Sequence, residues 1–162
     1  MTTLSPDLKA ARALALALPA LLLGGAYISQ YVFGLQPCEM CWWQRYPHMA
    51  AIVFALLAFV RGPVAPLVAA AALGILGSGL IGAFHAGVEY GWWEGLTACT
   101  AGPLAAGGDP LAAIMNAPVI RCDAVQWSLF GISLAGWNFI FSTGGALAVF
   151  VLLARDGKTQ GV

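Results

Sequence analysis

The chain has 162 residues, of which 60% are hydrophobic and 9% are charged, and its formal net charge at pH 7 is zero. With a mean hydropathy of +0.84, it carries too few charges to solvate the surface of a soluble globular protein. The charge balance also excludes a strongly basic protein that binds nucleic acid through its phosphates. This composition is typical of an integral membrane protein.

Four apolar segments are long enough to cross about 30 Å of hydrocarbon as helices that rise about 1.5 Å per residue. They cover approximately residues 13–33, 42–60, 64–84 and 134–154. The first segment is too long for the apolar core of a signal peptide, which favours a retained helix. Only Arg61, Gly62 and Pro63 separate the second segment from the third, so these two form an antiparallel hairpin. In the third segment small residues recur every four positions from Ala70 to Ala86, which favours close helix packing.

The stretch between the third and fourth segments, residues 87–133, is rich in glycine and proline and predicts a long irregular loop. Within it, residues 110–116 are apolar but too short to span a membrane. They are expected either to lie along the membrane surface or to fold onto the helix ends. The expected fold is therefore all-α: a single membrane domain over residues 1–162, built as a transmembrane four-helix bundle with a long irregular loop between helices 3 and 4.

The four cysteines fall into two pairs with different surroundings. Cys38 and Cys41 form a C-x-x-C motif just before the second segment, and such a motif is typical of a dithiol that opens and closes repeatedly. Cys99 and Cys122, with 22 residues between them, both lie in the loop. Two cysteine pairs at one membrane surface indicate thiol–disulfide chemistry.

The seven lysine and arginine residues are distributed unevenly between the two sides of the expected bundle. Five of them fall near the termini and in the turn between the second and third segments: Lys9, Arg12, Arg61, Arg155 and Lys158. By the positive-inside rule these parts are cytoplasmic, and the opposite side, which carries the loop and all four cysteines, faces outward. In a bacterium that side is the oxidising periplasm, where disulfides persist. The sequence thus predicts a multi-pass protein of the bacterial inner (cytoplasmic) membrane with a periplasmic loop.

Two motifs resemble those of a known family. Residues 37–45 read PCEMCWWQR, and residues 122–131 read CDAVQWSLFG. Together with the order of the apolar segments, these motifs resemble the DsbB family of quinone-dependent membrane disulfide oxidases, over approximately residues 12–155. The resemblance implies an enzyme that reoxidises a periplasmic, thioredoxin-like DsbA-type protein and passes the electrons to a membrane quinone, either ubiquinone or menaquinone.

The same resemblance implies a role for each cysteine. Cys38, Cys41, Cys99 and Cys122 are the expected catalytic residues. A reduced partner is expected to attack a disulfide between the two loop cysteines, and the electron pair then passes to the C-x-x-C pair. Which loop cysteine meets the partner is left open by the sequence.

Two further residues are candidates for binding the quinone. Arg45 lies one helical turn after Cys41, so its guanidinium is placed to stabilise a thiolate and to hydrogen bond a quinone carbonyl. An arginine at this depth could instead extend to the lipid headgroups. His85, at the outer end of the third segment, is similar in placement to a histidine implicated near the quinone in the family. A histidine at an interface more often only bonds water or a carbonyl group.

Other interpretations of the four cysteines remain open at this point. A zinc site would use four thiolates, but the long gap in the loop and the lack of a second C-x-x-C motif argue against it, so no metal is expected. Two static disulfides would brace a membrane protein that has no enzymatic activity. Enzymes of the vitamin K epoxide reductase type also combine four helices with a C-x-x-C motif, but there the loop pair precedes that motif, whereas here it follows.

Overall fold

The computed structural model describes residues 4–97 and 120–160. Four long helices make up most of this part: α1 (Pro6–Tyr31), α2 (Glu39–Val60), α3 (Val64–Glu89) and α5 (Leu134–Gln160). A short antiparallel hairpin of β1 (Ser128–Leu129) and β2 (Ile132–Ser133) leads into α5. The regular structure of the described chain is therefore all-helical apart from this hairpin.

α1 and α2 begin at side chains that cap their free backbone N–H groups. Ser5 accepts a hydrogen bond from the Leu8 N–H at 3.1 Å, and Pro6 occupies the first turn, where its missing N–H costs nothing. At α2 the cap is Cys38, whose sulfur accepts a hydrogen bond from the Cys41 N–H at 3.3 Å. The first cysteine of the C-x-x-C motif is thus fixed by the start of a helix.

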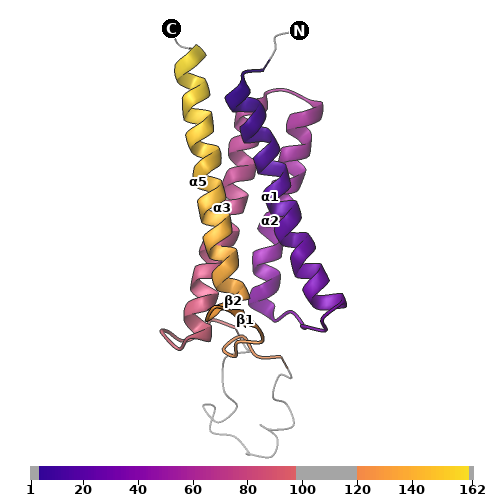
Figure 1. The fold of residues 1–162 in the computed structure, drawn as a ribbon, viewed down its shortest axis with the longest axis vertical. Coiled ribbons are helices and arrows are strands. Elements are labelled where there is room, and N and C mark those ends of the chain that lie inside the picture. Colours follow the sequence, from indigo (N-terminus) through magenta and orange to yellow (C-terminus); the bar gives the residue numbers. More distant parts are fainter. Residues whose placement is uncertain (1–3, 98–119, 161–162) are drawn as a thin grey trace, which may run out of the picture.

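The four helices run side by side along the long axis of the molecule (Figure 1). α3 packs along both α2 and α5, and α1 packs against the same two helices. Both termini and the turn between α2 and α3 lie at one end, whereas the connection from α1 to α2 and the β hairpin lie at the other. The C-x-x-C motif is therefore at the end opposite to the termini.

Small residues let the helices approach closely. Alanines dominate the buried core of the helix assembly: Ala11, Ala15, Ala51, Ala55, Ala58, Ala71, Ala72 and Ala146. Glycines of α3 mark very tight contacts with both neighbours. A Cβ atom at Gly74 would lie 3.0 Å from the Pro47 carbonyl oxygen of α2, and one at Gly82 would lie 2.9 Å from the Ala135 carbonyl oxygen of α5. The expected packing role of the small residues in this segment is confirmed at these two positions.

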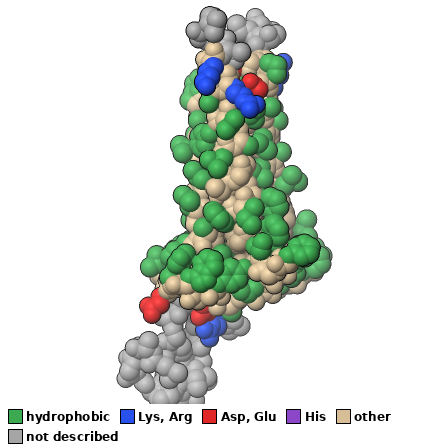
Figure 2. Space-filling model, turned by 60° about the vertical axis from the view of Figure 1, so that its left-hand side comes forward, with side chains coloured by type: hydrophobic (Ala, Val, Ile, Leu, Met, Phe, Trp, Pro, Cys, Tyr) green, Lys and Arg blue, Asp and Glu red, His purple; other side chains and the backbone are tan. Residues whose placement is uncertain are grey.

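Three of the described helices are long and apolar enough to cross a membrane: Pro6–Tyr31, Val64–Glu89 and Leu134–Lys158. The expected span over residues 42–60 is not among them, because the first half of α2 contains the polar residues Gln44, Arg45 and His48. All three of these side chains are buried between helices. On the face shown in Figure 2, hydrophobic side chains extend along the molecule and charged ones gather toward its two ends. This is the pattern of a multi-pass membrane protein.

The helices differ from the expected segments mainly at their ends. α1 begins at Pro6 and not near residue 13, because the capping residue lies well before the apolar stretch. α3 continues beyond the expected end at residue 84 as far as Glu89. His85 is therefore held on a regular helix and not at the edge of a loop.

The β hairpin gives regular structure to part of the expected irregular loop. Its two turn residues, Phe130 and Gly131, have positive φ angles of 53° and 79°, as a tight hairpin turn requires. The Tyr90 hydroxyl donates a hydrogen bond to the Gly131 carbonyl oxygen at 3.0 Å and accepts one from the Ser133 N–H at 2.8 Å. These bonds fasten the hairpin to the end of α3. Cys99 and the apolar stretch 110–116 lie outside the described residues.

Gly82→Ala is expected to destabilise the protein, because the added Cβ would lie 2.9 Å from the Ala135 carbonyl oxygen and 3.1 Å from the Asn138 amide. Overpacking of this kind costs about 1–3 kcal/mol. Gly77→Ala is the matched control, since nothing lies within 4 Å of a Cβ at that helical position. The midpoint of unfolding in detergent should fall for Gly82→Ala and stay equal or rise for Gly77→Ala. Equal midpoints in the two variants would contradict the close contact between α3 and α5.

Candidate active site

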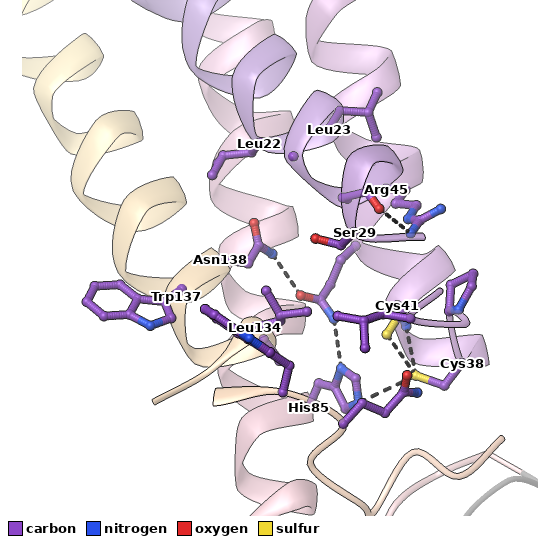
Figure 3. Close-up of a pocket in the computed structure, with 18 of the residues that line it drawn as sticks. Leu22, Leu23, Ser29, Cys38, Cys41, Arg45, His85, Leu134, Trp137 and Asn138 are labelled. Carbon is purple, nitrogen blue, oxygen red and sulfur yellow. Dashed lines mark hydrogen bonds between the residues drawn. The ribbon is translucent and has the colours of Figure 1, made fainter. Parts of the chain in front are cut away.

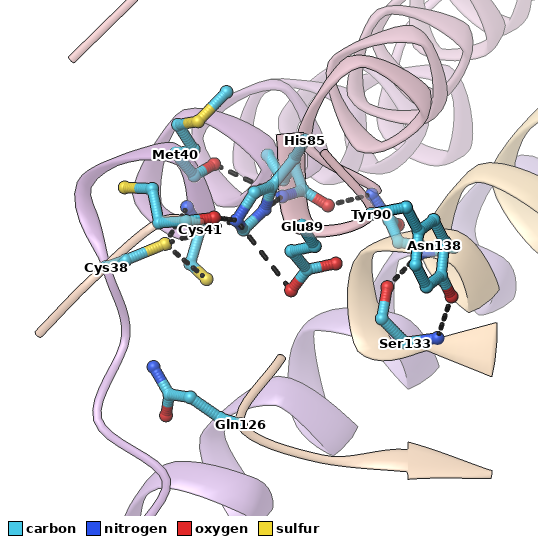
Figure 4. Close-up of polar contacts among 12 residues, drawn as sticks. Cys38, Met40, Cys41, His85, Glu89, Tyr90, Gln126, Ser133 and Asn138 are labelled. Atoms are coloured by element: carbon cyan, nitrogen blue, oxygen red, sulfur yellow. Dashed lines mark hydrogen bonds and ion pairs between the residues drawn. The ribbon is translucent and has the colours of Figure 1, made fainter. Parts of the chain in front are cut away.

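Three cysteines meet at the end of the molecule that carries the β hairpin. Cys38 and Cys41 lie one turn apart at the start of α2, with their sulfur atoms 2.9 Å apart (Figure 4). Cys122, from the segment before the hairpin, is fully buried and packs with Cys38 and Met40. Its sulfur accepts a hydrogen bond from the Thr97 hydroxyl at 3.4 Å. We call these three cysteines the sulfur cluster.

Cys38 and Cys122, the two members of the sulfur cluster that lie outside the helices, both have raised pKa values. The hydrogen bond from Cys38 to the Cys41 sulfur, together with burial, raises the pKa of Cys38 from 9.0 to about 12. Burial also raises the pKa of the Cys122 thiol. Both groups are therefore thiols at neutral pH, and the Cys38 proton is directed at the Cys41 sulfur. Cys41, at the helix N-terminus where the dipole favours an anion, is placed to carry thiolate charge.

His85 of α3 connects the sulfur cluster to the helices (Figure 4). Its Nε2 lies 3.6 Å from the Cys38 sulfur and 3.2 Å from the Cys122 carbonyl oxygen. Its Nδ1 lies 2.8 Å from the Gln44 amide nitrogen. One turn further along α3, Glu89 places a carboxylate oxygen 3.9 Å from Nε2. The imidazole is thus enclosed by polar groups from α2, α3 and the segment before the hairpin.

Arg45 is buried at the same end and is bound to α1. Its guanidinium donates hydrogen bonds to Gln30 Oε1 at 2.6 Å and to the Ala26 carbonyl oxygen at 3.2 Å. It also lies over the rings of Tyr27 and Trp42, 5.0 Å and 4.9 Å from their centroids. The side chain therefore ties α1 to α2 and does not extend outward.

A cavity of about 300 Å³ lies beside the C-x-x-C motif and is lined by residues of all four helices and the adjoining loops. Figure 3 shows Cys41 and His85 toward one end of this cavity, Leu22 and Leu23 of α1 toward the other, and Arg45 between them. Most of the lining is apolar. An apolar cleft with a few convergent polar groups is the usual form of a site for a small organic molecule.

A group of polar residues not anticipated from the sequence adjoins the sulfur cluster inside the helix assembly. Gln44 and His48 of α2, Ser78 of α3 and Asn138 of α5 are joined by hydrogen bonds. One sequence signal could have found them: polar side chains in apolar segments are costly and are retained for a role. Gln44 and His48 lie one helical turn apart in such a segment, and Asn138 lies near the start of another.

The family model described as disulfide bond formation protein DsbB matches residues 9–152 of the chain. The chain belongs to the DsbB family. The disulfide bond formation protein B of Acidovorax sp. (strain JS42) is 34% identical over 152 residues, which cover 86% of this chain and 83% of the relative. Those of Paracidovorax citrulli and Marinobacter nauticus are 34% and 30% identical, covering 84% and 83% of this chain and 81% and 85% of the relatives. No solved structure matches the chain.

Membership of the DsbB family makes the protein a multi-pass membrane protein of disulfide bond formation, with disulfide oxidoreductase activity. The structure gathers all but one of the residues predicted for the DsbB site around the sulfur cluster and the cavity: Cys38, Cys41, Cys122, Arg45 and His85. The exception, Cys99, lies outside the described residues. The role of each of these residues, and the absence of a metal, remain predictions.

In the reduced protein at neutral pH, a small alkylating reagent is expected to modify Cys41 before Cys38. Cys38 is only 3% exposed and keeps its proton up to a pKa of about 12, whereas Cys41 is partly exposed. Cys41→Ala removes the hydrogen-bond partner, so the pKa of Cys38 should fall, and burial should still hold it above its ordinary value. Mass spectrometry of the alkylated protein against pH measures both effects. Faster modification of Cys38 than of Cys41 at neutral pH would contradict this assignment.

Proposed function

We propose that this chain is a quinone-dependent disulfide oxidase that reoxidises a periplasmic, thioredoxin-like DsbA-type protein. The observation that carries the proposal is the packing of Cys122 against Cys38, beside a cavity lined by Arg45. A loop cysteine, the C-x-x-C motif and a binding cavity are thereby adjacent to one another. Static disulfides in a bracing role give no reason for a cavity beside the cysteines.

In the proposed relay, two exchange steps transfer electrons from the partner to the loop cysteines and then to the C-x-x-C pair. Disulfide bonds are transferred in the opposite direction. A thiolate of the reduced partner attacks the disulfide between Cys99 and Cys122, and the partner's second thiol completes the partner's disulfide. The two loop cysteines are then thiols, and their attack on the disulfide between Cys38 and Cys41 restores the loop disulfide. Each step moves two electrons and consumes one disulfide for each one formed. The burial of Cys122 against Cys38 supports the second step.

The residues around the cavity fit a quinone. Arg45 provides hydrogen-bond donors beside Cys41, His85 adds a polar imidazole to the lining, and the leucines of α1 provide an apolar lining for an isoprenoid tail (Figure 3). The volume of about 300 Å³ is at the lower end of the range of ligand sites. When bound, ubiquinone or menaquinone would accept the two electrons and two protons of the Cys38–Cys41 dithiol. Arg45 would bind a carbonyl oxygen through guanidinium N–H groups that α1 does not engage.

The proposed enzyme resides in the bacterial inner membrane with both termini in the cytoplasm and its cysteines in the periplasm. Five basic residues near the termini and in the turn between α2 and α3 support this orientation: Lys9, Arg12, Arg61, Arg155 and Lys158. Figure 1 shows the termini and this turn at the end opposite to the β hairpin. All four helices would then cross the membrane as a bundle within a single domain over residues 1–162. The polar half of α2 would be shielded from lipid by its neighbours, and the loop between α3 and α5 would meet the partner.

Cys99→Ser is expected to abolish oxidation of a DsbA-type partner, because the disulfide that the partner attacks can no longer form. Exchange of electrons between small dithiols and quinone should continue through Cys38 and Cys41. Cys41→Ser is the matched control and should abolish both reactions. Quinone reduction followed by absorbance, with each electron donor in turn, separates the outcomes. Partner oxidation at the parental rate in Cys99→Ser would overturn the relay, whereas absence of quinone-coupled turnover in the parent would favour static disulfides.

Arg45→Ala is expected to raise the apparent KM for quinone by about tenfold to a hundredfold, since a charge-assisted hydrogen bond contributes about 1.5–3 kcal/mol. Arg45→Lys keeps the charge but loses the planar set of donors, so its effect should be smaller. Gln30→Ala tests the tie to α1 separately, because it removes an acceptor of Arg45 without removing the charge. Disulfide exchange between the cysteine pairs should be retained in all three variants. Unchanged quinone kinetics in well-folded Arg45→Ala would exclude Arg45 from quinone binding.

A further inference from the structure

A chain of hydrogen bonds links His85 to the interior of the helix assembly through two side-chain amides (Figure 3). Gln44 Nε2 lies 2.8 Å from His85 Nδ1 and 3.2 Å from the Met40 carbonyl oxygen. Gln44 Oε1 accepts a hydrogen bond from Asn138 Nδ2 at 2.9 Å. Asn138 Nδ2 also lies 3.1 Å from both the carbonyl oxygen and the hydroxyl oxygen of Ser78. Gln44 thus connects one nitrogen of the imidazole to residues of α3 and α5.

Backbone carbonyl groups fix the direction of the bonds in this chain, because a carbonyl oxygen only accepts. The carbonyl of Ser78 requires Asn138 to face it with its NH₂ group, which leaves Asn138 Oδ1 to accept from His48 Nε2 at 3.0 Å. The carbonyl of Met40 likewise requires Gln44 to face it with its NH₂ group. Gln44 Oε1 then faces the Asn138 donor. Turning either amide over would set two acceptors against each other. Each amide therefore has one orientation that satisfies its partners.

The last link in the chain is the imidazole of His85. Since Gln44 presents an N–H group to Nδ1, that nitrogen must be the unprotonated acceptor. The proton of the neutral ring is then on Nε2. That nitrogen faces another carbonyl oxygen, that of Cys122 at 3.2 Å, and the Cys38 sulfur at 3.6 Å. Both sides of the ring demand the same tautomer.

We propose that Gln44, oriented by Asn138, is a positioning residue that holds His85 as its neutral Nε2–H tautomer. The one N–H group of the ring is then directed at the Cys122 carbonyl oxygen and the Cys38 sulfur. Protonation of Nδ1 would set two N–H groups against each other, and the Gln44 amide would have to turn and lose its other bonds. His85 therefore acts on the cysteines as a hydrogen-bond donor and not as a base through Nδ1.

The ionisable groups that face the ring in the described structure are thiols and one carboxyl group. Cys38 and Cys41 face it from the start of α2, and their two sulfur atoms and one ring nitrogen of His85 all lie within 4.8 Å of one another. Cys122 faces it from the segment before the hairpin only through its backbone carbonyl group, and Glu89 faces it from its own helix at 3.9 Å from Nε2. A neutral N–H donor stabilises a thiolate in this setting without a permanent positive charge. The tautomer does not depend on the proposed function, and only its use in thiol exchange rests on that function.

Nitrogen NMR of full-length protein with isotope-labelled histidine, in detergent micelles or nanodiscs, measures the tautomer directly. The chain has two histidines, and a His85→Asn variant assigns the remaining signals to His48. At neutral pH, His85 is expected to show a protonated Nε2 and an unprotonated Nδ1. A proton on Nδ1, either alone or in an imidazolium, would overturn the proposal whatever the redox activity of the protein.

Gln44→Glu keeps the shape of the side chain but replaces its N–H donor with an acceptor. The Nδ1 atom of His85 should then gain a proton, so the ring becomes positively charged. The charged ring should lower the pKa of Cys38, and each unit of that fall increases the thiolate fraction of Cys38 at a given pH about tenfold. Gln126→Glu is the matched control, because it adds the same charge at an exposed position near the cysteine end and should leave the tautomer unchanged. An unaltered Nε2–H ring in Gln44→Glu, matching that of Gln126→Glu, would overturn the role assigned to Gln44. The protonation of the two ring nitrogens can be measured without turnover. A failure of the role assigned to Gln44 is therefore distinguishable from a failure of the quinone relay.

Discussion

Polar side chains buried between apolar helices must find their partners inside the protein, because neither lipid nor a neighbouring leucine can bond them. Asn138 meets this constraint by bonding α2 through Gln44 and His48, and α3 through Ser78. A buried amide left without partners costs about 1–3 kcal/mol. The network therefore fixes the rotation and depth of three helices relative to one another. The position of His85 beside the cysteines follows from that alignment.

The network and the small residues of α3 depend on each other. The amide of Asn138 reaches the backbone carbonyl of Ser78 only because α5 lies very close to α3. A Cβ atom at Gly79 would lie 2.8 Å from Thr143 Oγ1 of α5, so the absence of side chains along this line permits the approach. Close backbone packing and polar bonding, which are often treated as separate sources of membrane protein stability, act here at the same contact.

The sequence predicts the helices, the position of the C-x-x-C motif and the family because each depends on local pattern: apolar length, residue spacing and short motifs. It does not predict that Cys122 packs against Cys38, because two residues far apart in the chain are brought together only by tertiary structure. The partners of Arg45 on α1 were missed for the same reason. Average hydropathy also conceals the polar network, since a few polar residues on the inward faces change the mean of an apolar segment only slightly. α2 is the exception, and there its polar half lowers the mean enough to remove it from the candidate spans.

The sulfur of Cys38 belongs to the C-x-x-C dithiol and is also the hydrogen-bond acceptor that caps α2. An N-terminal cap contributes about 1 kcal/mol to the stability of a helix. The strength of a sulfur acceptor changes with its charge and with its covalent state, so the order of the first turn of α2 and the oxidation of the motif are thermodynamically linked. Linkage is reciprocal: whatever tightens this turn also shifts the reduction potential, with about 30 mV corresponding to about 1.4 kcal/mol. The stability of the first turn of α2 therefore affects the thiol–disulfide equilibrium of the motif.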